Sequence, residues 1–454
     1  MAPVGGVSCG GEHTLLLSRD TGALYSAGAC GLGWDGRQPL AQEQATLDQR
    51  SKPCLVPKFF AALRGSAGLP LHPIQKAVGG YYHSLAISRA GGLYSWGCGN
   101  FEGMNDGQLG QGRDKEDNTS PALVQMPGLE PGERVVDAAA GCYHSAVLTS
   151  KHRVFTFGLN NYGQLGRSGL AADEPVPRSP PPTAGDASGS SSDSYADGVP
   201  RPVESMPGAD KSGGGLVAGI GAGFYNVYLL SRSGGFRCAG SNTSGQCGSA
   251  TTTHTTPTEV PELSGVQLRQ AVGGYCHTLV LDNNGTVFSL GCGEDGQRGD
   301  ARPMEGDPVA AGEQEAHDEA VESYEPCVMN ACAVPSSAPV SSIAAGANHS
   351  LAVSDGELYG WGSNEHGQLG SSIPESGASA PCHVALPLDR GCGERVTQVS
   401  AGYAHTAVLT SAGRALVFGR GENGQLGRGQ AVDDAEPLAV HVDLASPCQD
   451  SSLV

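Results

Sequence analysis

The sequence predicts an all-β fold in which seven similar units of antiparallel strands close into a ring. Three observations predict it: a surplus of glycine, a pair of strand-like runs that recurs seven times, and a strand signal that is missing at one end of the chain and left over at the other. Glycine accounts for 69 of the 454 residues, about 15% against a usual share of roughly 7%. Such a surplus is expected where a chain makes many tight turns.

Each unit starts with a glycine-rich turn that is followed by a histidine and an apolar run. GGYYHSLAIS at 79–88 and AGANHSLAVS at 345–354 are typical. From the histidine, which we call the anchor, to the glycine that closes the next run is always 13 to 15 residues. The spacing between anchors varies much more, so the unit is a fixed module with connections of variable length. The seven anchors are His13, His83, His144, Asn226, His277, His349 and His405.

The two runs of each module predict an antiparallel hairpin. The first run is almost entirely apolar, as in a strand that is buried on both faces. The second run, such as LYSWG at 93–97 or VFTFG at 154–158, is aromatic and β-branched. Between the runs lie turn residues such as NNG at 283–285, which supply the positive φ that a tight hairpin needs.

The tetrapeptide GQLG follows the second run and occurs at 107–110, 163–166, 367–370 and 424–427. We expect it to be the turn after the hairpin, with its leucine packed between neighbouring units. A phosphate-binding loop would need a following helix and a lysine, and neither follows GQLG in this sequence.

A Pro-x-x-Val word upstream of most hairpins predicts a third strand, because proline is tolerated at the start or edge of a strand. The first hairpin, 9–28, has no such word before it, whereas a word at 437–440 has no hairpin after it. In a ring, the last strand completes the first sheet and leaves no open edge. We therefore expect closure between 437–445 and 7–28, with the N- and C-terminal strands paired in one composite blade.

The motifs GGxxHS/T, LYxWG, N-x-x-GQLG and P-x-x-V resemble the repeat of the regulator of chromosome condensation family over nearly the whole chain. The resemblance implies one seven-bladed β-propeller domain spanning 1–454. Members of that family act in nucleotide exchange on the Ran GTPase, in ultraviolet-B sensing in plants or in plain protein binding, so the fold leaves the function open.

Composition narrows the class of partner. The formal net charge of −19 opposes binding to nucleic-acid backbones, so no nucleic-acid partner is expected and basic proteins suit better. The apolar runs are too short for a membrane span. The N-terminus lacks the basic region of a secretory signal, which predicts a cytoplasmic or nucleocytoplasmic protein.

The cysteines and histidines predict neither a cofactor nor a metal site. The 14 cysteines include no CxxC pair, and we expect reduced thiols. Cys327 and Cys332 have no second cluster with zinc-ligand spacing. Six histidines at one repeat position are expected to be structural hydrogen-bonding groups, a role that Asn226 can also fill. No catalytic motif stands out, so we expect no enzyme and no catalytic residue.

Function is expected where the modules differ, because loops on a rigid scaffold carry binding residues. The insertion 29–52 places Trp34 and Arg37 in a loop outside the repeat, as a contact site or as local packing. The insertion 167–199 is rich in Pro, Ser and acidic residues and is expected to be disordered; its serines are phosphate acceptors or part of a passive loop. The acidic loop 300–325 docks a basic partner or keeps a loop soluble. Its candidate contact residues are Glu313, Glu315, Asp318 and Glu319.

The insertion 99–106 has two interpretations. The exchange factor of the family inserts a short wedge after a WG strand end, and this chain is lengthened at the same point, with Phe101, Glu102 and Asp106 as candidate contacts. An ordinary lengthened turn accounts for the same residues. The light-sensing function needs clustered tryptophans, whereas Trp96 and Trp361 occupy one repeat position and are expected in the core of the blades.

We therefore expect a non-enzymatic protein–protein interaction scaffold within a larger assembly, of a cytoskeletal or ciliary kind. The alternative is a guanine-nucleotide exchange factor for a small GTPase of the Ran type, which uses the insertion 99–106.

Overall fold

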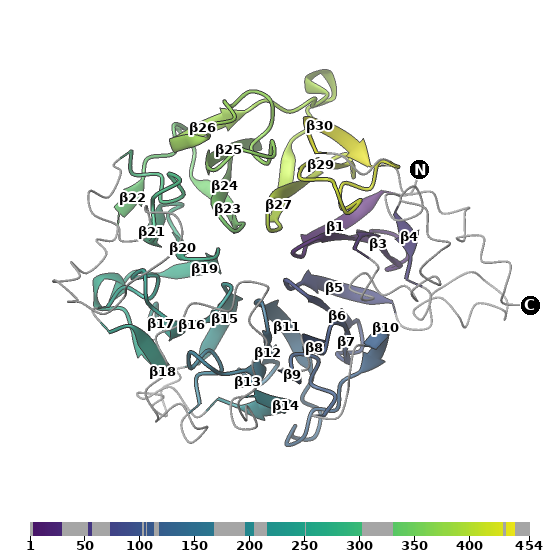
Figure 1. Cartoon of the computed structure of the whole chain (residues 1–454), viewed down its shortest axis with the longest axis vertical. Coiled ribbons are helices and arrows are strands. Elements are labelled where there is room, and N and C mark those ends of the chain that lie inside the picture. Colours follow the sequence, from purple (N-terminus) through teal and green to yellow (C-terminus); the bar gives the residue numbers. More distant parts are fainter. Residues whose placement is uncertain are drawn as a thin grey trace, which may run out of the picture.

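Seven four-stranded antiparallel sheets surround a central axis in the computed structural model (Figure 1). The structure describes residues 3–29, 53–56, 73–101, 104–105, 107–112, 118–167, 196–203, 216–249, 251–301, 330–429 and 433–440. The helices in this part of the chain are two 3-10 turns, η2 (Pro261–Leu263) and η3 (Arg390–Cys392). No described helix is long and apolar enough to cross a membrane. The predicted all-β, seven-bladed propeller is confirmed.

Each sheet is one blade, and each blade is built from one stretch of chain whose four strands lie side by side, the first nearest the axis and the last at the outer edge. Blade 1 holds β1 (Val4–Cys9), β2 (His13–Ser18), β3 (Leu24–Gly28) and β4 (Cys54–Leu55), and blade 2 holds β5 (Ile74–Gly79), β6 (His83–Ser88), β7 (Leu93–Gly97) and β10 (Asn118–Leu123). Blade 3 holds β11 (Val135–Ala140), β12 (His144–Thr149), β13 (Val154–Leu159) and β14 (Ala196–Pro202), and blade 4 holds β15 (Val217–Ala222), β16 (Asn226–Ser231), β17 (Phe236–Ser241) and β18 (Thr253–Glu259). Blade 5 holds β19 (Leu268–Gly273), β20 (His277–Asp282), β21 (Val287–Gly291) and β22 (Asn330–Cys332). Blade 6 holds β23 (Val340–Ala345), β24 (His349–Ser354), β25 (Glu357–Gly362) and β26 (Ala378–Val384), and blade 7 holds β27 (Val396–Ala401), β28 (His405–Thr410), β29 (Ala415–Gly419) and β30 (Asp434–Val440).

The predicted hairpin forms the second and third strands of every blade. In blade 6, for example, the anchor His349 lies opposite Gly362, the glycine that closes the second run. The second strand is buried along its whole length in six of the blades, as an apolar run predicts. Trp96 and Trp361 are fully buried, which confirms that they belong to the core of their blades.

The innermost strand of each blade was not predicted. Segments such as VAGIGA (β15) and VSSIAA (β23) precede the anchor turn and face the central channel. Their residues are small and alternate only weakly between apolar and polar, because one face lines a narrow channel instead of a hydrophobic core.

The predicted composite blade is wrong. The strand that begins at the Pro-x-x-Val word pairs with the hairpin before it and not with the hairpin after it: Leu55 lies opposite Tyr25, and Ala439 lies opposite Leu416. Blade 1 is therefore complete with β4, and blade 7 is complete with β30. Each word lies between two hairpins in the sequence, so its spacing alone does not show which one it joins. The proline occupies the outer edge of its own blade, where a missing N–H breaks no ladder bond.

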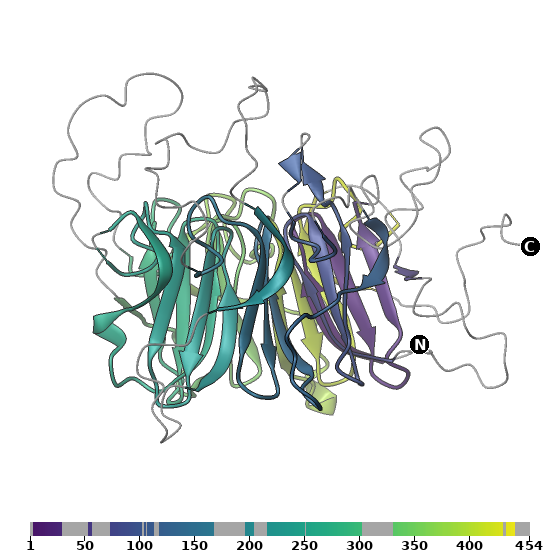
Figure 2. The same cartoon turned by 90° about the horizontal axis from the view of Figure 1, so that it is seen from below.

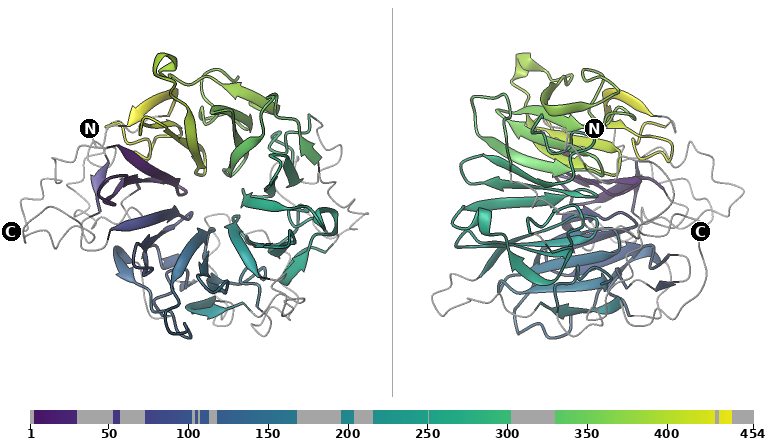
Figure 3. Two further views of the ribbon diagram at one scale, coloured as in Figure 1. Left: turned by 180° about the vertical axis from the view of Figure 1, so that it is seen from behind. Right: turned by 60° about the vertical axis from the view of Figure 1, so that its left-hand side comes forward.

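Side-chain packing between blades 7 and 1 closes the ring instead. Val7, Leu16 and Tyr25 of blade 1 share a buried cluster with Leu409 and Val417 of blade 7. One such hydrophobic cluster fills each of the seven junctions between blades. Figure 3 shows blade 1 (purple) between blade 2 (blue) and blade 7 (yellow).

Hydrogen bonds reinforce the same junction. Gln398 of β27 donates to the carbonyl of Val7 at 3.0 Å, and the N–H of Cys9 donates to Ser400 at 2.9 Å. Gln270 of blade 5 makes the equivalent bond to Ile343 of blade 6 at 2.8 Å. The junction between the first and last blades is therefore built like an internal junction.

The GQLG segments are turns, as predicted. In each copy the last glycine donates to the carbonyl of the first, for example Gly166 to Gly163 at 2.9 Å, and both glycines have positive φ. The leucine packs between blades: Leu369 lies in the cluster between blades 6 and 7, and Leu426 lies in the cluster between blades 7 and 1.

The propeller has two different faces because the strands alternate in direction. The turns between the first and second strands (10–12, 80–82, 141–143, 223–225, 274–276, 346–348 and 402–404) and the GQLG-type turns lie on one side, which we call the anchor-turn face. The tight hairpin turns between the second and third strands, together with η2 and η3, lie on the opposite face. In Figure 2 a small two-stranded sheet, β8 (Asn100–Phe101) and β9 (Met104–Asn105), rises above the blades on the anchor-turn face.

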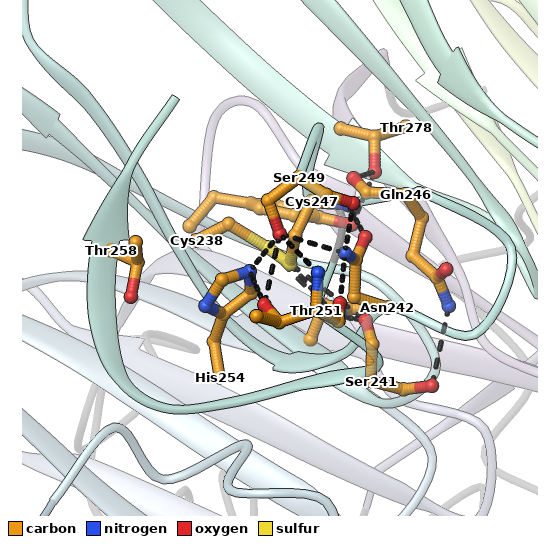
Figure 4. The surroundings of a disulfide bond; sticks show 12 residues. Cys238, Ser241, Asn242, Gln246, Cys247, Ser249, Thr251, His254, Thr258 and Thr278 are labelled. Carbon is orange, nitrogen blue, oxygen red and sulfur yellow. Dashed lines mark hydrogen bonds between the residues drawn. A yellow bond between two sulfur atoms is a disulfide. The ribbon is translucent and has the colours of Figure 1, made fainter. Parts of the chain in front are cut away.

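Blade 4 contains a disulfide between Cys238 of β17 and Cys247 of the following turn, which corrects the prediction that all cysteines are reduced (Figure 4). Cys247 replaces the leucine of GQLG, and Cys238 occupies the strand position held by Ser95 in blade 2 and Thr156 in blade 3. The blade fold brings these two positions to a Cα–Cα distance of 5.5 Å, within the range of a disulfide. Eight other described cysteines form no disulfide.

Both ends of the insertion 167–199 are structured, so the predicted disorder does not extend to them. Arg167 is buried and lies 3.0 Å from Asp197, and Ala196–Pro202 form β14. Residues 168–195 lie outside the described part of the chain. The Pro200–Val203 word and the residues just before it form the outer strand of blade 3.

Candidate functional site

A ring of hydrogen bonds joins each anchor histidine to the next blade. Nε2 of His83 lies 2.7 Å from the hydroxyl of Ser145, which donates in turn to the carbonyl of Gln108 at 2.9 Å. Because the hydroxyl donates its single proton to that carbonyl, the imidazole is the donor in the other hydrogen bond and is the neutral Nε2–H tautomer. The same contact recurs in the pairs His13–Ser84, His277–Ser350, His349–Thr406 and His405–Thr14, at 2.8 to 3.2 Å.

Burial keeps the anchor histidines uncharged. None of the six is more than 1% exposed. Burial lowers the pKa of His83, His277, His349 and His405 to about 3 and that of His13 and His144 to about 4. The glycine three residues earlier makes room for the ring, since a methyl group at Gly402 would lie 2.1 Å from Cε1 of His405. This geometry is what a structural hydrogen-bonding role requires.

The residues described by the structure include no group of three or more His, Cys, Asp or Glu side chains that could hold a metal ion. A channel of about 430 Å³ runs along the axis and is lined by the innermost strands. Lys76 forms an ion pair with Asp137 inside it. At the anchor-turn face, Tyr81, Phe224 and Tyr403 meet across the mouth of this channel.

Aromatic side chains gather on the anchor-turn face around that mouth. The ring centroid of Tyr81 lies 5.2 Å from that of Phe224 and 5.5 Å from that of Tyr403. The ring centroids of Phe224 and Tyr275 are 5.4 Å apart. These pairs come from blades 2, 4, 5 and 7, so the cluster bridges the ring. The complete set, which we call the aromatic sector, is Tyr81, Tyr82, Tyr143, Tyr162, Phe224, Tyr225, Tyr275 and Tyr403.

The fold does not demand these rings. Apart from Tyr162, they occupy the two positions just before the anchor, and blades 1 and 6 fill the first of these positions with Gly11 and Ala347. None of the eight is fully buried, and Tyr275 is 41% exposed. A partly exposed aromatic cluster that a repeat architecture can do without is a candidate contact surface.

Five carboxylates lie in other turns of the anchor-turn face. Glu12 lies in the anchor turn of blade 1, and the GQLG-type turns of blades 5, 6 and 7 carry Glu294, Asp295, Glu365 and Glu422. We call these five residues the acidic sector. Arg420, on the same face, already contacts two of them, Glu422 at 2.8 Å and Glu12 at 3.8 Å.

Of the residues predicted from sequence to bind partners, the structure describes the backbone of Phe101, at the end of β8. The others lie outside the described residues: Trp34, Arg37, Glu102, Asp106, Glu313, Glu315, Asp318 and Glu319. The described ends of their insertions lie on the anchor-turn face: Ala29 donates to the carbonyl of Glu12 at 2.8 Å, and Ala301 follows the GQLG-type turn of blade 5.

Comparison with known proteins agrees with this geometry. The family model of the RCC1-like domain matches residues 102–451. The chain is 28% identical to the ultraviolet-B receptor UVR8 of Arabidopsis thaliana over 97% of its own length and 83% of that protein. It is 30% identical to the probable E3 ubiquitin-protein ligase HERC6 of Homo sapiens over 70% of its length, which is only 27% of that longer protein.

Two further similarities concern exchange factors and the fold. The chain is 28% identical to the secretion-regulating guanine nucleotide exchange factor of Bos taurus, over 76% of this chain and 63% of that one. The crystal structure of human WBSCR16 superposes with a TM-score of 0.66 at 20% identity, over 92% of this chain and 93% of that one. The second similarity concerns the fold alone.

Proposed function

The chain belongs to the RCC1-like domain family, and we propose that it is a non-enzymatic protein-binding scaffold that binds its partner on the anchor-turn face. The observation that carries the proposal is the aromatic sector. Its rings stand at turn positions where Gly11 and Ala347 serve the same architecture, so packing within the blades does not account for them. Tyrosine is enriched where proteins bind proteins.

The candidate loops 29–52, 99–106 and 300–325 extend the same proposal. Their described ends, such as Ala29 and Ala301, lie on the anchor-turn face, which supports a role in binding there. Loops on a rigid scaffold commonly carry binding residues. That the assembly is cytoskeletal or ciliary stays a prediction.

Affinity purification with mass spectrometry from matched cells tests the proposal. Wild-type chain is compared with a Tyr275→Ser/Tyr403→Ser variant and with a control in which Leu123 and Leu438, both 50% exposed on outer strands, become serine. We expect the first variant alone to lose specific partners. Equal loss in the control, or no loss in either, contradicts the proposal. The recovered partners also identify the assembly.

Light sensing receives no support from the described tryptophans. Trp96 and Trp361 lie in blades 2 and 6, which are not neighbours, and each is fully buried. The similarity to UVR8 therefore extends to the propeller and not to a tryptophan cluster in the described part of this chain.

The second candidate function is nucleotide exchange on a small GTPase. It is favoured by the β8–β9 sheet, a structured projection at the insertion 99–106 on the anchor-turn face, and by the similarity to an exchange factor. Release of a fluorescent guanine nucleotide from a panel of small GTPases tests it. Acceleration that deletion of 99–106 abolishes supports exchange, provided that the variant melts at the wild-type temperature; no acceleration by the wild type contradicts it.

A further inference from the structure

The two sectors of the anchor-turn face adjoin each other at both ends. At one end, Gly11 in the turn of blade 1 donates to the carbonyl of Gly80 at 3.1 Å, which places Glu12 next to Tyr81. After burial and its aromatic neighbours, the charge of Glu12 contributes to raising the pKa of the Tyr81 hydroxyl. At the other end, Asp295 lies near Cys276, the neighbour of Tyr275 in the chain. Electron-rich rings are therefore flanked by carboxylates.

Two carboxylates of the acidic sector, Asp295 and Glu365, have no ion-pair partner among the described residues, whereas Glu12 and Glu422 share Arg420. Burial and then the charge of Glu365 raise the pKa of Asp295, so these two acids from neighbouring blades repel each other. Other arginines of this face are occupied, because Arg298 pairs with Asp300 at 2.9 Å and Arg167 pairs with Asp197 at 3.0 Å. A cation supplied from outside would relieve the repulsion.

We propose that the anchor-turn face binds a lysine- and arginine-rich segment of a partner protein, with cationic side chains over the aromatic sector and ion pairs to the acidic sector. Two features of this face favour a cationic segment over an uncharged apolar one. Tyrosine rings attract ammonium and guanidinium groups through their electron-rich faces, and the flanking carboxylates complement the same charge. The proposal rests on the proposed function and specifies the chemistry of its partner.

An extended segment suits the site better than a folded domain surface. The rings come from separate turns in blades 2, 3, 4, 5 and 7, and Tyr81, Phe224 and Tyr403 meet across the channel mouth, so the aromatic surface is spread over several turns. Successive side chains of an extended peptide can contact successive turns. Arginine is expected to bind more tightly than lysine, because its planar guanidinium stacks on rings and pairs with carboxylates in a bidentate manner.

Fluorescence anisotropy with labelled synthetic peptides tests the proposal on the full chain. The probes are three peptides of equal length in which glycine alternates with arginine, lysine or glutamate. We expect binding in the order arginine, lysine, glutamate, with no binding of the glutamate peptide, and an affinity for the arginine peptide that falls as salt rises. Equal binding of all three peptides, or no binding of the arginine peptide, overturns the proposal.

Variants locate the site. Asp295→Asn/Glu365→Gln removes charge, and Tyr275→Leu keeps apolar volume while removing the aromatic ring. We expect each to weaken arginine-peptide binding at least tenfold at low salt. The matched control, Glu130→Gln/Glu262→Gln, removes two exposed acids on the opposite face and is expected to leave binding within twofold. An equal effect in the control overturns the proposal, because the attraction would then be to net charge.

The outcome separates this inference from the proposed function. If partners recovered by purification depend on Tyr275 and Tyr403 while no basic peptide binds, the scaffold function stands and the cationic partner is wrong. If neither depends on the anchor-turn face, both are wrong.

Discussion

Blades 4 and 6 solve the same structural problem with different residues. In blade 6, His349 donates to Thr406 of the next blade at 3.2 Å. Blade 4 has Asn226 at the anchor, and the bond to the next blade comes instead from Tyr228, whose hydroxyl lies 2.8 Å from Thr278. Thr278 donates to the carbonyl of Gln246, just as Thr406 donates to that of Gln368. Figure 4 shows Thr278 directed at Gln246 beside the disulfide.

The preceding blade adjusts in a matching way. Blade 4 has Val227 where the other blades have a serine or threonine, so His144 donates to the main-chain carbonyl of Asn226 at 3.0 Å. Every junction thus keeps a buried hydrogen bond although the donor and the acceptor change. The anchor position therefore supports the junction between blades, since a catalytic histidine could not be replaced by a tyrosine two residues away.

Lowering the pH should have the largest effect on stability, and only the blades with a histidine anchor should contribute to it through the anchor. Because burial holds the pKa of the six anchor histidines at about 3 to 4 in the folded state, below about 6.5 when unfolded, the unfolded chain binds more protons as the pH falls. Each histidine then removes about 1.4 kcal/mol of stability per pH unit, and six together remove roughly 8 kcal/mol per unit between about pH 5.5 and 4.5. Denaturant unfolding monitored by circular dichroism from pH 7.5 to 4.5 measures this slope.

The matching control copies blade 4 into blade 6. His349→Asn is expected to lower the slope by about one proton, or about 1.4 kcal/mol per pH unit, whatever it does to stability at pH 7.5. Stability that stays constant down to pH 4.5 would contradict neutral, buried anchors. A loss of stability confined to the pH range in which Glu133 and Glu394 titrate in the unfolded chain would also contradict them. Paired arginines lower the pKa of both carboxyls to about 2 in the folded state, so these two groups alone would cause such a loss.

Removing one anchor should be the next largest effect. His349→Ala deletes a fully buried ring and leaves Thr406 without its donor, which should lower the free energy of unfolding at pH 7.5 by about 3 kcal/mol. Asn226→Ala in blade 4 should cost less, because the bond between blades is made there by Tyr228. Chemical denaturation of both variants checks the order, and equal losses would contradict the division of roles between Asn226 and Tyr228.

The disulfide offers a smaller test. Cys238→Ser opens a link between residues nine positions apart and should cost about 2 to 3 kcal/mol by loss of loop-closure entropy. The double variant Cys238→Ser/Cys247→Leu gives blade 4 the residue types that blade 2 has at the same positions, Ser95 and Leu109. It should recover part of the lost stability by packing. Thermal unfolding with and without a reductant measures both, and a wild type that is insensitive to reductant would contradict a stabilising bond.

Most of the fold could be predicted because each module repeats short-range signals. The spacing from anchor to closing glycine, the turn residues and GQLG each act within about fifteen residues, and the count of seven follows directly. The wrong composite blade depends on a contact between distant segments. The Pro-x-x-Val strand lies between two hairpins, and pairing of Leu55 with Tyr25 is not encoded in its spacing. The Cys238–Cys247 bond was missed because the pair lacks a familiar motif.

The candidate site was harder to predict for a physical reason. Tyr81, Phe224, Tyr275 and Tyr403 are visible in GGYYHS, AGFYNV, GGYCHT and AGYAHT, but they occupy positions that vary within the motif. Their significance appears only when the ring closes and brings turns from blades 2, 4, 5 and 7 to one mouth. The sequence did indicate where irregular insertions lie, and the described ends of those insertions share this face.

The smallest predicted effect is the sharpest test of how blade 4 differs. Tyr228→Phe removes one hydroxyl while the buried ring keeps its packing against Phe236, so it should cost only about 1 kcal/mol, the value of one buried hydrogen bond. The urea midpoint should shift without a change in slope. In the double variant Tyr228→Phe/Asn226→Ala, the loss of unfolding free energy should exceed the sum of the two single-variant losses only if Asn226 also supports the junction with blade 5. No shift from Tyr228→Phe would mean that blade 4 holds its neighbour by packing alone, and that the anchor bond is dispensable wherever the apolar cluster is large enough.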